Sequence, residues 1–421
     1  MYAAVRPVIQ VLIAVVFMEG GLGILSPLVS VELARRGVPS DLIGLVTSAY
    51  FAGFLVGTLT GHRIIDRSGH VRAFAVFAAL AANAVLAHLM FSDALVWVGL
   101  RAVLGYAFAG LFVIVESWLN DKATEDTRGR VFAVYMVVSW AATGVSPLAL
   151  HFEERLGATI LLGIVAMLVT TALVPMALTR VGNPEIGHRE HFGIRRLLGI
   201  SPSGVTVCFG SGLVTSAFYG LLPAYAERGG FTTSELAIIY SGSTVAGLII
   251  QYPIGTLSDR LGRRPLMVAC AFGGTAIAGT VAWLGPMTFP MLFALLFALE
   301  GIVAPLYALG VGQTNDYIER KDFVAASAGL LFAWGVGAAA GPTAAGFAMT
   351  RIGDAGLFWF MAAGLGFVAA FLLVRIAIRH AKSAREQGNF VAVPLTPGTY
   401  GAPEMDPRAP PEHHPHRLPD D

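Results

Sequence analysis

Twelve long apolar segments, separated by short polar turns, constrain this chain more than any other feature of its sequence. Each has the ~20 residues that a helix needs to cross a hydrocarbon layer ~30 Å thick. The runs are continuous and lack the alternation of a strand with one polar face, which favours helices over a barrel. The sequence therefore predicts an all-α integral membrane protein with transmembrane helices at about residues 6–31, 40–62, 73–91, 94–119, 128–151, 156–179, 202–226, 234–258, 265–284, 288–313, 323–346 and 354–379.

The composition agrees with a membrane protein. Of the 421 residues, 55% are hydrophobic and only 13% are charged, which lies outside the range of a soluble domain. The net charge of +1 gives no overall field that would attract nucleic acid. The two cysteines, Cys208 and Cys270, lie inside apolar runs and indicate no disulfide or metal site. We expect the lipid bilayer as the surroundings, and neither a metal, a cofactor nor a nucleic-acid partner.

The segments form two copies of one six-helix unit. The sequence Asp66-Arg67-x-Gly69 recurs as Asp259-Arg260-x-Gly262, an offset of 193 residues (259 − 66). Other landmarks recur at nearly the same offset: Asn120-Asp121 with Asn315-Asp316, Trp140 with Trp334, and Pro147 with Pro342. We expect a first half at 1–180, a linker at 181–201, a second half at 202–380, and a Pro-rich, disordered cytoplasmic tail at 381–421.

The distribution of Lys and Arg predicts the orientation. The flanks and loops on the side of the N-terminus hold 20 of the 28 Lys and Arg residues. The opposite side holds five of them: Arg35, Arg36, Arg155, Arg228 and Arg351. Because cytoplasmic loops carry the excess of positive charge, both termini are expected in the cytoplasm. An even number of spans agrees with that orientation.

The two charged turns and the half-chain repeat together resemble the loop signature of the major facilitator superfamily. The turns that carry this resemblance comprise Asp66, Arg67, Gly69 and Arg72 in the first half, and Gly255, Asp259, Arg260, Gly262, Arg263 and Arg264 in the second. The first copy departs from the pattern, since His62 stands where glycine is expected and His70 where a basic residue is expected. The run Glu116-Ser117-Trp118-Leu119-Asn120 is similar to the YcaD-like bacterial branch of that superfamily.

The resemblance implies a function and a location. Members of the superfamily rock two halves around a site near the bilayer midplane. The resemblance implies that the first, fourth, seventh and tenth helices line the cavity and that the charged turns hold the cytoplasmic gate. Arg101, with Gly105 and Gly110, resembles the arginine of the fourth helix that is linked to proton coupling. It also implies a bacterial inner-membrane protein that works as a monomer.

Four ionisable residues inside the spans are candidates for substrate binding or proton coupling: Glu19, Arg101, Glu116 and Glu300. Charge at the bilayer centre costs ~2.5–3.5 kcal/mol, so such residues face protein or water and are rarely idle. All four lie on the first, fourth or tenth segment. Arg101 and Glu116 share a helix face but lie ~22 Å apart, so they cannot pair. The alternative for each acid is a hydrogen-bonded structural carboxyl.

Four aromatic residues are weaker candidates. Trp140 and Trp334 lie at mid-depth, away from the membrane interfaces where tryptophan is an ordinary anchor. They would either stack on a ring-shaped substrate or pack between helices. Tyr219 and Tyr307 could add phenolic hydrogen-bond donors.

The sequence favours a secondary active transporter of a small organic solute, driven by protons. No Walker loop, HExxH or GxSxG pattern is present, so ATP use and an enzymatic role are not expected. A transporter-like sensor or scaffold and an intramembrane enzyme remain alternatives. Within transport, multidrug efflux stands beside nutrient or metabolite transport. The fifth segment has only Gly144 and Pro147 of the fuller Gly-Pro signature that drug antiporters carry, which weighs against efflux.

Overall fold

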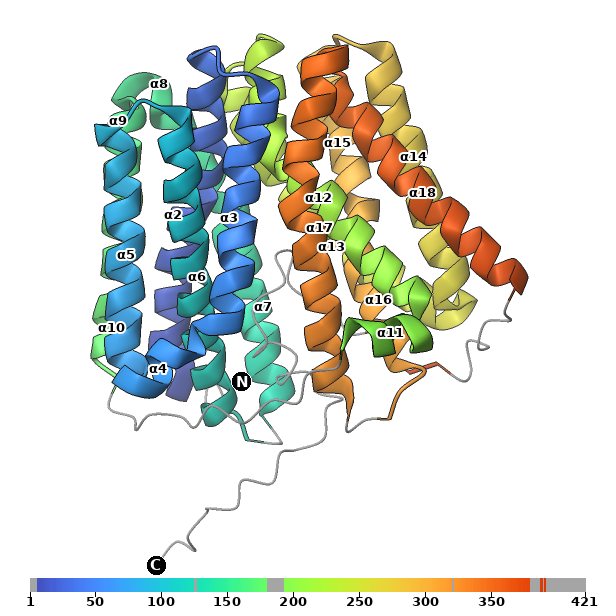
Figure 1. Cartoon of the computed structure of the whole chain (residues 1–421), viewed down its shortest axis with the longest axis horizontal. Helices are drawn as coiled ribbons and strands as arrows, with labels where there is room; N and C mark the ends of the chain where they lie inside the picture. The colour runs from blue at the N-terminus through green and yellow to red at the C-terminus, as the bar shows by residue number, and fades with distance from the viewer. Residues whose placement is uncertain are drawn as a thin grey trace, which may run out of the picture.

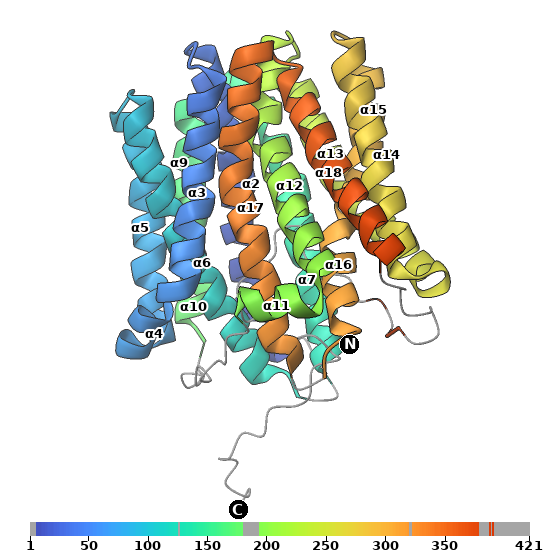
Figure 2. The same ribbon diagram turned by 45° about the vertical axis from the view of Figure 1, so that its right-hand side comes forward.

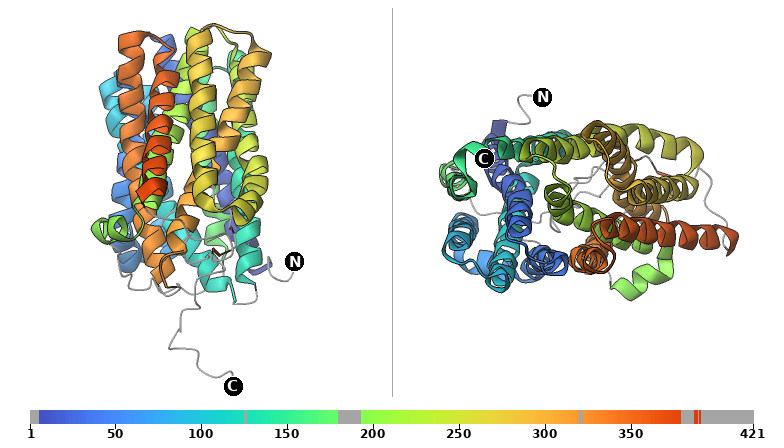
Figure 3. Two further views of the ribbon diagram at one scale, coloured as in Figure 1. Left: turned by 90° about the vertical axis from the view of Figure 1, so that its right-hand side faces the viewer. Right: turned by 90° about the horizontal axis from the view of Figure 1, so that it is seen from above.

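The computed structural model describes residues 6–124, 127–179, 193–319, 322–378, 387, 388 and 390. Twelve helices in this part of the chain are long and apolar enough to cross a membrane, which confirms the predicted number. They stand side by side in one bundle (Figure 1), and a turn of the view keeps the same arrangement (Figure 2). Seen from above, the first six spans and the last six occupy adjacent halves of the bundle (Figure 3).

The first half contains six spans, two of which are interrupted. The fifth span changes to a 3-10 helix at Ser146, next to Pro147, whose ring removes a backbone donor. The sixth is broken at Ala172. The elements in order are η1 (Arg6–Val8), α2 (Ile9–Arg35), α3 (Ser40–Thr60), α4 (His62–Ser68), α5 (His70–Met90), α6 (Ala94–Lys122), α7 (Arg128–Val145), η2 (Ser146–Phe152), α8 (Glu153–Leu156), α9 (Ala158–Thr171) and α10 (Leu173–Ala177).

The second half repeats this plan after a short helix. Its tenth span is broken at Ala304, and Pro305 begins a new helix. The elements are α11 (Ile194–Ile200), α12 (Pro202–Arg228), α13 (Thr233–Leu261), α14 (Arg263–Leu284), α15 (Phe289–Val303), α16 (Pro305–Asn315), α17 (Phe323–Ile352) and α18 (Gly356–Ile378).

Local sequence fixes where several helices begin and end. At the start of α13, Thr232 and Glu235 form a capping box, in which each side chain accepts from the other's backbone N–H. The same helix ends at Gly262, whose φ of +88° is a left-handed conformation that glycine adopts without strain. Gly69 ends α4 with φ +76° at the corresponding position of the first half. Both charged turns therefore depend on their glycine.

Glycines also let the helices approach closely. A Cβ at Gly105 of α6 would overlap the carbonyl oxygen of Tyr50 in α3, and one at Gly53 of α3 would overlap that of Ala102. In the second half, Gly212 and Gly337 have the same role between α12 and α17. Small residues at such crossings are the usual means by which membrane helices associate. Helix α17 also packs along α3, joining the two halves, as Figures 1 and 2 show.

The bundle has two distinct ends. The terminal end, drawn at the bottom of Figure 1, carries the short helices α4 and α11 and the start of the first span. The distal end carries the turns at 36–39, 229–232 and 353–355. Of the expected linker, residues 181–192 lie outside the described part of the chain, while α11 occupies 194–200 and packs on α12 and α17.

Most of the tail that was expected to be disordered, from residue 381 on, lies outside the described residues. Gln387, Gly388 and Phe390 are placed, and all three contact the second charged turn. The composition of the tail gave no sign of this, because the contacts are made largely by backbone groups.

Candidate functional site

A cavity lies at the centre of the bundle and is lined by both halves. Its volume is about 100 Å³, several times the ~10–15 Å³ that one water needs by this measure. The wall contains two charged side chains, Glu19 and Arg101, among aromatic rings and hydroxyls. The lining residues are Glu19, Leu22, Gly23, Ser26, Thr47, Tyr50, Phe51, Phe54, Arg101, Phe112, Thr143, Thr215, Ser216, Tyr219, Gly220, Tyr240, Thr244 and Trp334.

The helices that form this wall only partly match the expected set. The first, fourth and seventh spans contribute through α2, α6 and α12, as the resemblance implied. The second, fifth, eighth and eleventh spans contribute as well, through α3, α7, α13 and α17. Residues of the tenth span are set behind the wall, since Glu300 is reached from the cavity through Tyr219.

Glu19 is held by two hydroxyls from the neighbouring helix α7. Ser139 Oγ lies 2.6 Å from each carboxyl oxygen, and Thr143 Oγ1 donates to Oε2 at 3.0 Å. Ser139 and Thr143 are four residues apart and therefore lie on one face of α7. The carboxyl is 1% exposed, yet it lines the cavity. Glu19 is thus positioned by the protein and reachable by whatever fills the cavity.

Arg101 lies at the cavity wall without an acidic partner in the described part of the chain. Its guanidinium carbon is 4.8 Å from the centre of the Tyr50 ring, a cation–π distance. Its Nε and Nη1 atoms are buried and have no hydrogen-bond partner among the described residues. Among the described residues, no ion pair joins Arg101 to Glu19 or to Glu300.

A polar path leads from the cavity to Glu300. Tyr219 and Tyr240 form an edge-on ring pair 4.9 Å apart on the wall, and Thr244 Oγ1 donates to the Tyr219 hydroxyl at 3.5 Å. The Glu300 carboxyl is fully buried next to Tyr219, and neither of its oxygens has a hydrogen-bond partner among the described residues. A proton or a rearranged hydrogen bond could reach Glu300 by this route without the acid touching the solute.

Of the four remaining candidate residues, three lie off the cavity and one lies on its wall. Glu116 is fully buried near the terminal end of α6, where Tyr135 donates to it at 3.5 Å. Trp140 packs at Gly247 of α13, which fits the expectation of packing between helices. Trp334 does line the cavity. Its ring centre lies 6.0 Å from that of Phe51, edge-on, and 6.4 Å from that of Tyr307. Tyr307 itself is buried behind Trp334 rather than on the wall.

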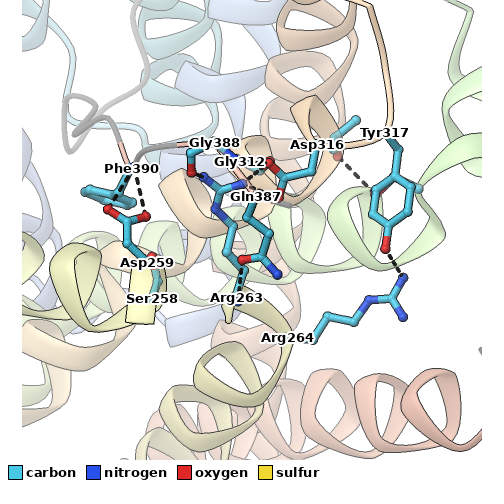
Figure 4. Close-up of polar contacts among 12 residues, drawn as sticks. Ser258, Asp259, Arg263, Arg264, Gly312, Asp316, Tyr317, Gln387, Gly388 and Phe390 are labelled. Carbon is cyan, nitrogen blue, oxygen red and sulfur yellow. Dashed lines mark hydrogen bonds and ion pairs between the residues drawn. The ribbon is translucent and has the colours of Figure 1, made fainter. Parts of the chain in front are cut away.

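The second charged turn forms hydrogen bonds and an ion pair with the end of the tenth span, and hydrogen bonds with the tail (Figure 4). The Arg263 guanidinium forms an ion pair with Asp316 and donates to the Gly312 carbonyl at 2.8 Å. Both side chains of that pair are almost fully buried. Arg264 donates to the Tyr317 hydroxyl at 3.2 Å, whereas Arg260 is exposed.

The first charged turn also contacts the end of a span, the fourth, but through a histidine in place of an arginine. His70 occupies the position that Arg263 holds in the second copy, 193 residues later (263 − 70). Its Nε2 contacts Ser117 Oγ at 3.1 Å, and its ring stacks on Trp118 at 6.0 Å. Ser117 precedes Gly312, the partner of Arg263, by 195 residues (312 − 117), the offset of the Asn-Asp landmarks. The departure at His70 is therefore a buried replacement, while Asp66, Arg67 and Arg72 are exposed.

At the distal end, two arginines join the halves reciprocally. Arg35 ends the first helix of the first half and donates to Glu227 at 3.0 Å and Thr233 at 2.9 Å in the second half. Arg228 ends the corresponding helix of the second half and reaches back to Ser40 and to the Val38 carbonyl. Glu153, of the first half, also accepts from Arg35 at 2.7 Å.

These contacts obey the repeat. Arg228 follows Arg35 by 193 residues (228 − 35), and Thr233 follows Ser40 by the same number (233 − 40). Arg35 of the first half thus binds Thr233 of the second half. Arg228 of the second half binds Ser40, which holds the matching position in the first half. We call Arg35, Arg228, Ser40, Thr233 and Glu227 the distal network. In the sequence, both arginines contribute to the Lys and Arg bias, and the equal offsets of 193 residues are the signal that could have identified the pair.

The sequence is similar to a known family and to known proteins over most of its length. A model described as Major Facilitator Superfamily matches residues 11–241 and 204–405. YE1530 of Yersinia enterocolitica, an uncharacterized MFS-type transporter, is 30% identical over 380 residues, covering 89% of this chain and 97% of that protein. YcaD of Salmonella paratyphi A, also an uncharacterized MFS-type transporter, is 28% identical over 379 residues, covering 90% of this chain and 97% of that protein.

Solved structures share the fold at low sequence identity. The nucleoside transporter NupG superposes with a TM-score of 0.71 at 12% identity, covering 87% of this chain and 98% of that one. An auto-inhibited peptide transporter of the POT family gives a TM-score of 0.73 at 12% identity, covering 93% and 99%. At this identity the likeness concerns the arrangement of helices alone.

Proposed function

The chain belongs to the major facilitator superfamily, within its YcaD-like branch, and from this premise we propose that it moves a small organic solute by alternating access. The observation that carries the proposal is the central cavity, whose wall is built from both halves and contains Glu19 and Arg101. A site between two halves becomes open to one side or the other when the halves rock.

The distal network supports one of the two states that alternating access requires. It joins the halves by charge-assisted hydrogen bonds at the end opposite the termini. A second layer of cross-half contacts lies nearby, where Thr343 donates to Ser48 at 2.8 Å and Ser30 donates to the Gly220 carbonyl at 2.7 Å. We propose that this set is the closed distal gate, and that it breaks when the site opens to that side.

Loss of either cross-half arginine should favour opening of the distal gate. Arg35→Ala removes the cross-half ion pair with Glu227, and Arg228→Ala removes the cross-half hydrogen bonds to Ser40 and Val38. At ~0.2–1 kcal/mol for such partly exposed contacts, the ratio of open to closed should rise up to about fivefold. Distances between spin labels at Leu95→Cys and Pro286→Cys, with Cys208 and Cys270 replaced by alanine, would measure the shift. Arg36→Ala is the matched control because Arg36 pairs with Glu32 of its own helix. An equal response to all three variants would contradict the gate.

The orientation follows from the Lys and Arg bias and stays a proposal. We place the terminal end in the cytoplasm and the protein in the bacterial inner membrane. Reporter fusions at Arg180 and Lys382 should report the cytoplasm, and a fusion at Gly229 should report the outside. A periplasmic signal from either of the first two would overturn this orientation.

We propose that protons drive the transport through Glu19, Glu300 or both. A carboxyl in the membrane body is costly when ionised and bare, so its charge responds to whether the cavity is open to water. Glu19 lines the cavity and Glu300 is reached through Tyr219. A group exposed first to one side and then to the other can take up a proton on one side and release it on the other.

Flux distinguishes transport from the remaining alternatives. Growth of a deletion strain on a panel of nutrients and toxicants would nominate solutes, and purified protein in liposomes should then exchange the labelled solute across the membrane. A sensor or scaffold would bind the solute without flux. An intramembrane enzyme would change it chemically, which analysis of the recovered solute would reveal. Export of many unrelated compounds would indicate multidrug efflux.

A further inference from the structure

The cavity contains one buried cation whose hydrogen-bonding capacity is unused. Arg101 is 2% exposed and lines the wall, and its Nε and Nη1 atoms have no hydrogen-bond partner within the described part of the chain. A guanidinium has five N–H donors and is always charged. A buried charge without an ionic partner is expensive unless a ligand or water supplies acceptors. The site is therefore short of a negative group.

The surroundings of Arg101 indicate what the rest of the ligand is like. Its guanidinium lies over the Tyr50 ring at 4.8 Å. The wall nearby is formed by the rings of Phe51, Phe54, Phe112 and Trp334, which offer flat apolar surfaces. A few hydroxyls, of Thr47, Thr215 and Ser216, complete it. The site therefore suits a compact ligand with an apolar or aromatic body and one anionic group.

We propose that the cavity takes a small organic anion, whose carboxylate binds the Arg101 guanidinium through paired N–H···O bonds while its apolar body packs on the aromatic wall. This inference rests on the proposed transport function and specifies its substrate class. Glu19 shares the cavity, and an ionised Glu19 would repel the anion. Anion and proton would therefore bind together, so the transport is symport of the two.

Binding of matched anionic and neutral probes tests this site in detergent micelles. Benzoate and octanoate should bind the wild-type protein at least about tenfold tighter than benzamide and octanamide, as expected for a charge-assisted pair worth ~1.4 kcal/mol or more. Titration calorimetry, or the fluorescence change from Trp334 on the wall, would measure this preference. In Arg101→Met the preference should disappear, while Arg101→Lys, which keeps the charge without the fork, should keep part of it.

Two results would overturn the anion site. One is equal binding of the acids and their amides to the wild-type protein, including no binding of either. The other is unchanged benzoate affinity in Arg101→Met that unfolds at the wild-type temperature. Both are separate from failure of the proposed function, because flux of any other solute in liposomes would leave transport standing.

A second, independent observation concerns the tail. Three residues of it occupy the second charged turn (Figure 4). The Phe390 backbone N–H donates to both oxygens of Asp259, at 3.0 and 3.2 Å. The Gly388 carbonyl accepts from Arg263 at 2.6 Å, and the Gly388 N–H donates to Asp316 at 3.1 Å. The Gln387 side chain accepts from the Arg263 backbone N–H at 3.1 Å.

The Phe390 ring completes the contact. It lies against Gly255, where a Cβ would overlap its atoms, so the glycine of the motif leaves room for the ring. Arg263 and Asp316 are 1% and 4% exposed at the side chain and are bridged by Gly388, which bonds to both. The tail therefore closes over the motif residues that would otherwise be available to neighbouring parts of the chain.

We propose that Gln387, Gly388 and Phe390 form a tail latch that holds the second charged turn in this conformation and so restrains rocking of the halves at the terminal end. The tail binds both carboxyl oxygens of Asp259, and the Nη2 and backbone N–H of Arg263. For the terminal end to close, these groups would have to exchange the tail for contacts across the halves. Release of the latch therefore favours closure at the terminal end and opening at the distal end.

Two truncations that differ by six residues test the latch without a substrate. Removal of everything after Glu386 deletes the latch, whereas removal of everything after Ala392 keeps it. Spin labels at Arg130→Cys and Ile378→Cys report the terminal end, and labels at Leu95→Cys and Pro286→Cys report the distal end. In the protein that ends at Glu386, the terminal distances should shorten and the distal distances should lengthen. The protein that ends at Ala392 should match the full chain. Phe390→Pro, which lacks the N–H that binds Asp259, should shift in the same direction as the protein that ends at Glu386.

Identical distance distributions for the two truncations would overturn the latch. An equal shift in both truncated proteins would also overturn it, because the shift would then come from loss of the residues after Ala392. Thermal unfolding of each protein shows whether the shorter one is folded. A shifted distribution in a protein that unfolds at the wild-type temperature supports the latch, and an unshifted one contradicts it.

Discussion

Proton-driven accumulation of solute should be lost when Glu19 or Glu300 is replaced by glutamine, while solute exchange between equal pools continues. Glutamine keeps the size of the side chain and one oxygen that can accept from Ser139 or Thr143, but it cannot titrate. A gradient of one pH unit corresponds to 1.36 kcal/mol, or up to about tenfold accumulation with one proton. In the variant the solute ratio across a liposome membrane should fall to about one.

Glu116→Gln is the matched control for this experiment. Glu116 is also a fully buried carboxyl of the membrane body, but it lies off the cavity beside Tyr135. If it abolishes accumulation as the other two do, the cavity is not what couples protons to transport. Retention of proton-driven accumulation in the Glu19→Gln, Glu300→Gln double variant would mean that these acids bind substrate or stabilise the fold. Accumulation driven by a sodium gradient in the presence of an uncoupler would replace protons with sodium.

The same substitution at two glycines of one helix should change stability in opposite directions. Gly105→Ala places a Cβ against the Tyr50 carbonyl oxygen, so α3 and α6 must separate, at a cost of about 1–3 kcal/mol for an overpacked crossing. Gly99→Ala adds a Cβ in open space and removes the helix penalty of glycine, up to about 1 kcal/mol. Thermal unfolding in detergent should therefore place the two variants on opposite sides of the wild type. Destabilisation of both by the same amount would mean that the crossing does not depend on close approach.

The spans could be predicted from the sequence because a helix that crosses the lipid must be apolar along its length, and hydropathy measures this property directly. Their ends could not be placed as well. The first helix extends to Arg35 rather than 31, since its last turn is held by polar contacts across the halves that no apolar count detects. The third span begins at His70 rather than 73, because His70 is buried against Trp118 and Ser117 and behaves as part of the core.

The charged residues of the candidate site could be predicted from the sequence, but the residues that contact them could not. Glu19 and Arg101 were identifiable because a charge in an apolar run is conspicuous, whereas Ser139 and Thr143 are ordinary residues 120 and more positions away in the chain. Tyr50 and Tyr240 were missed for the same reason. The tail contacts left no trace in the sequence, since Gly388 and Phe390 bind through backbone N–H and C=O groups that every position has.

The reciprocal contacts of Arg35 with Thr233 and Arg228 with Ser40 have a consequence for the origin of the chain. They have the form of an isologous dimer interface, in which one residue of each subunit contacts the same partner position on the other. A single six-helix protein with an arginine at the end of its first helix and a hydroxyl at the start of its second would close against a copy of itself by these bonds. Fusion of two such genes would keep the interface unchanged. In this chain the arginine and its hydroxyl partner are present in both halves, whereas the two copies of the charged turn differ at His70 and Arg263.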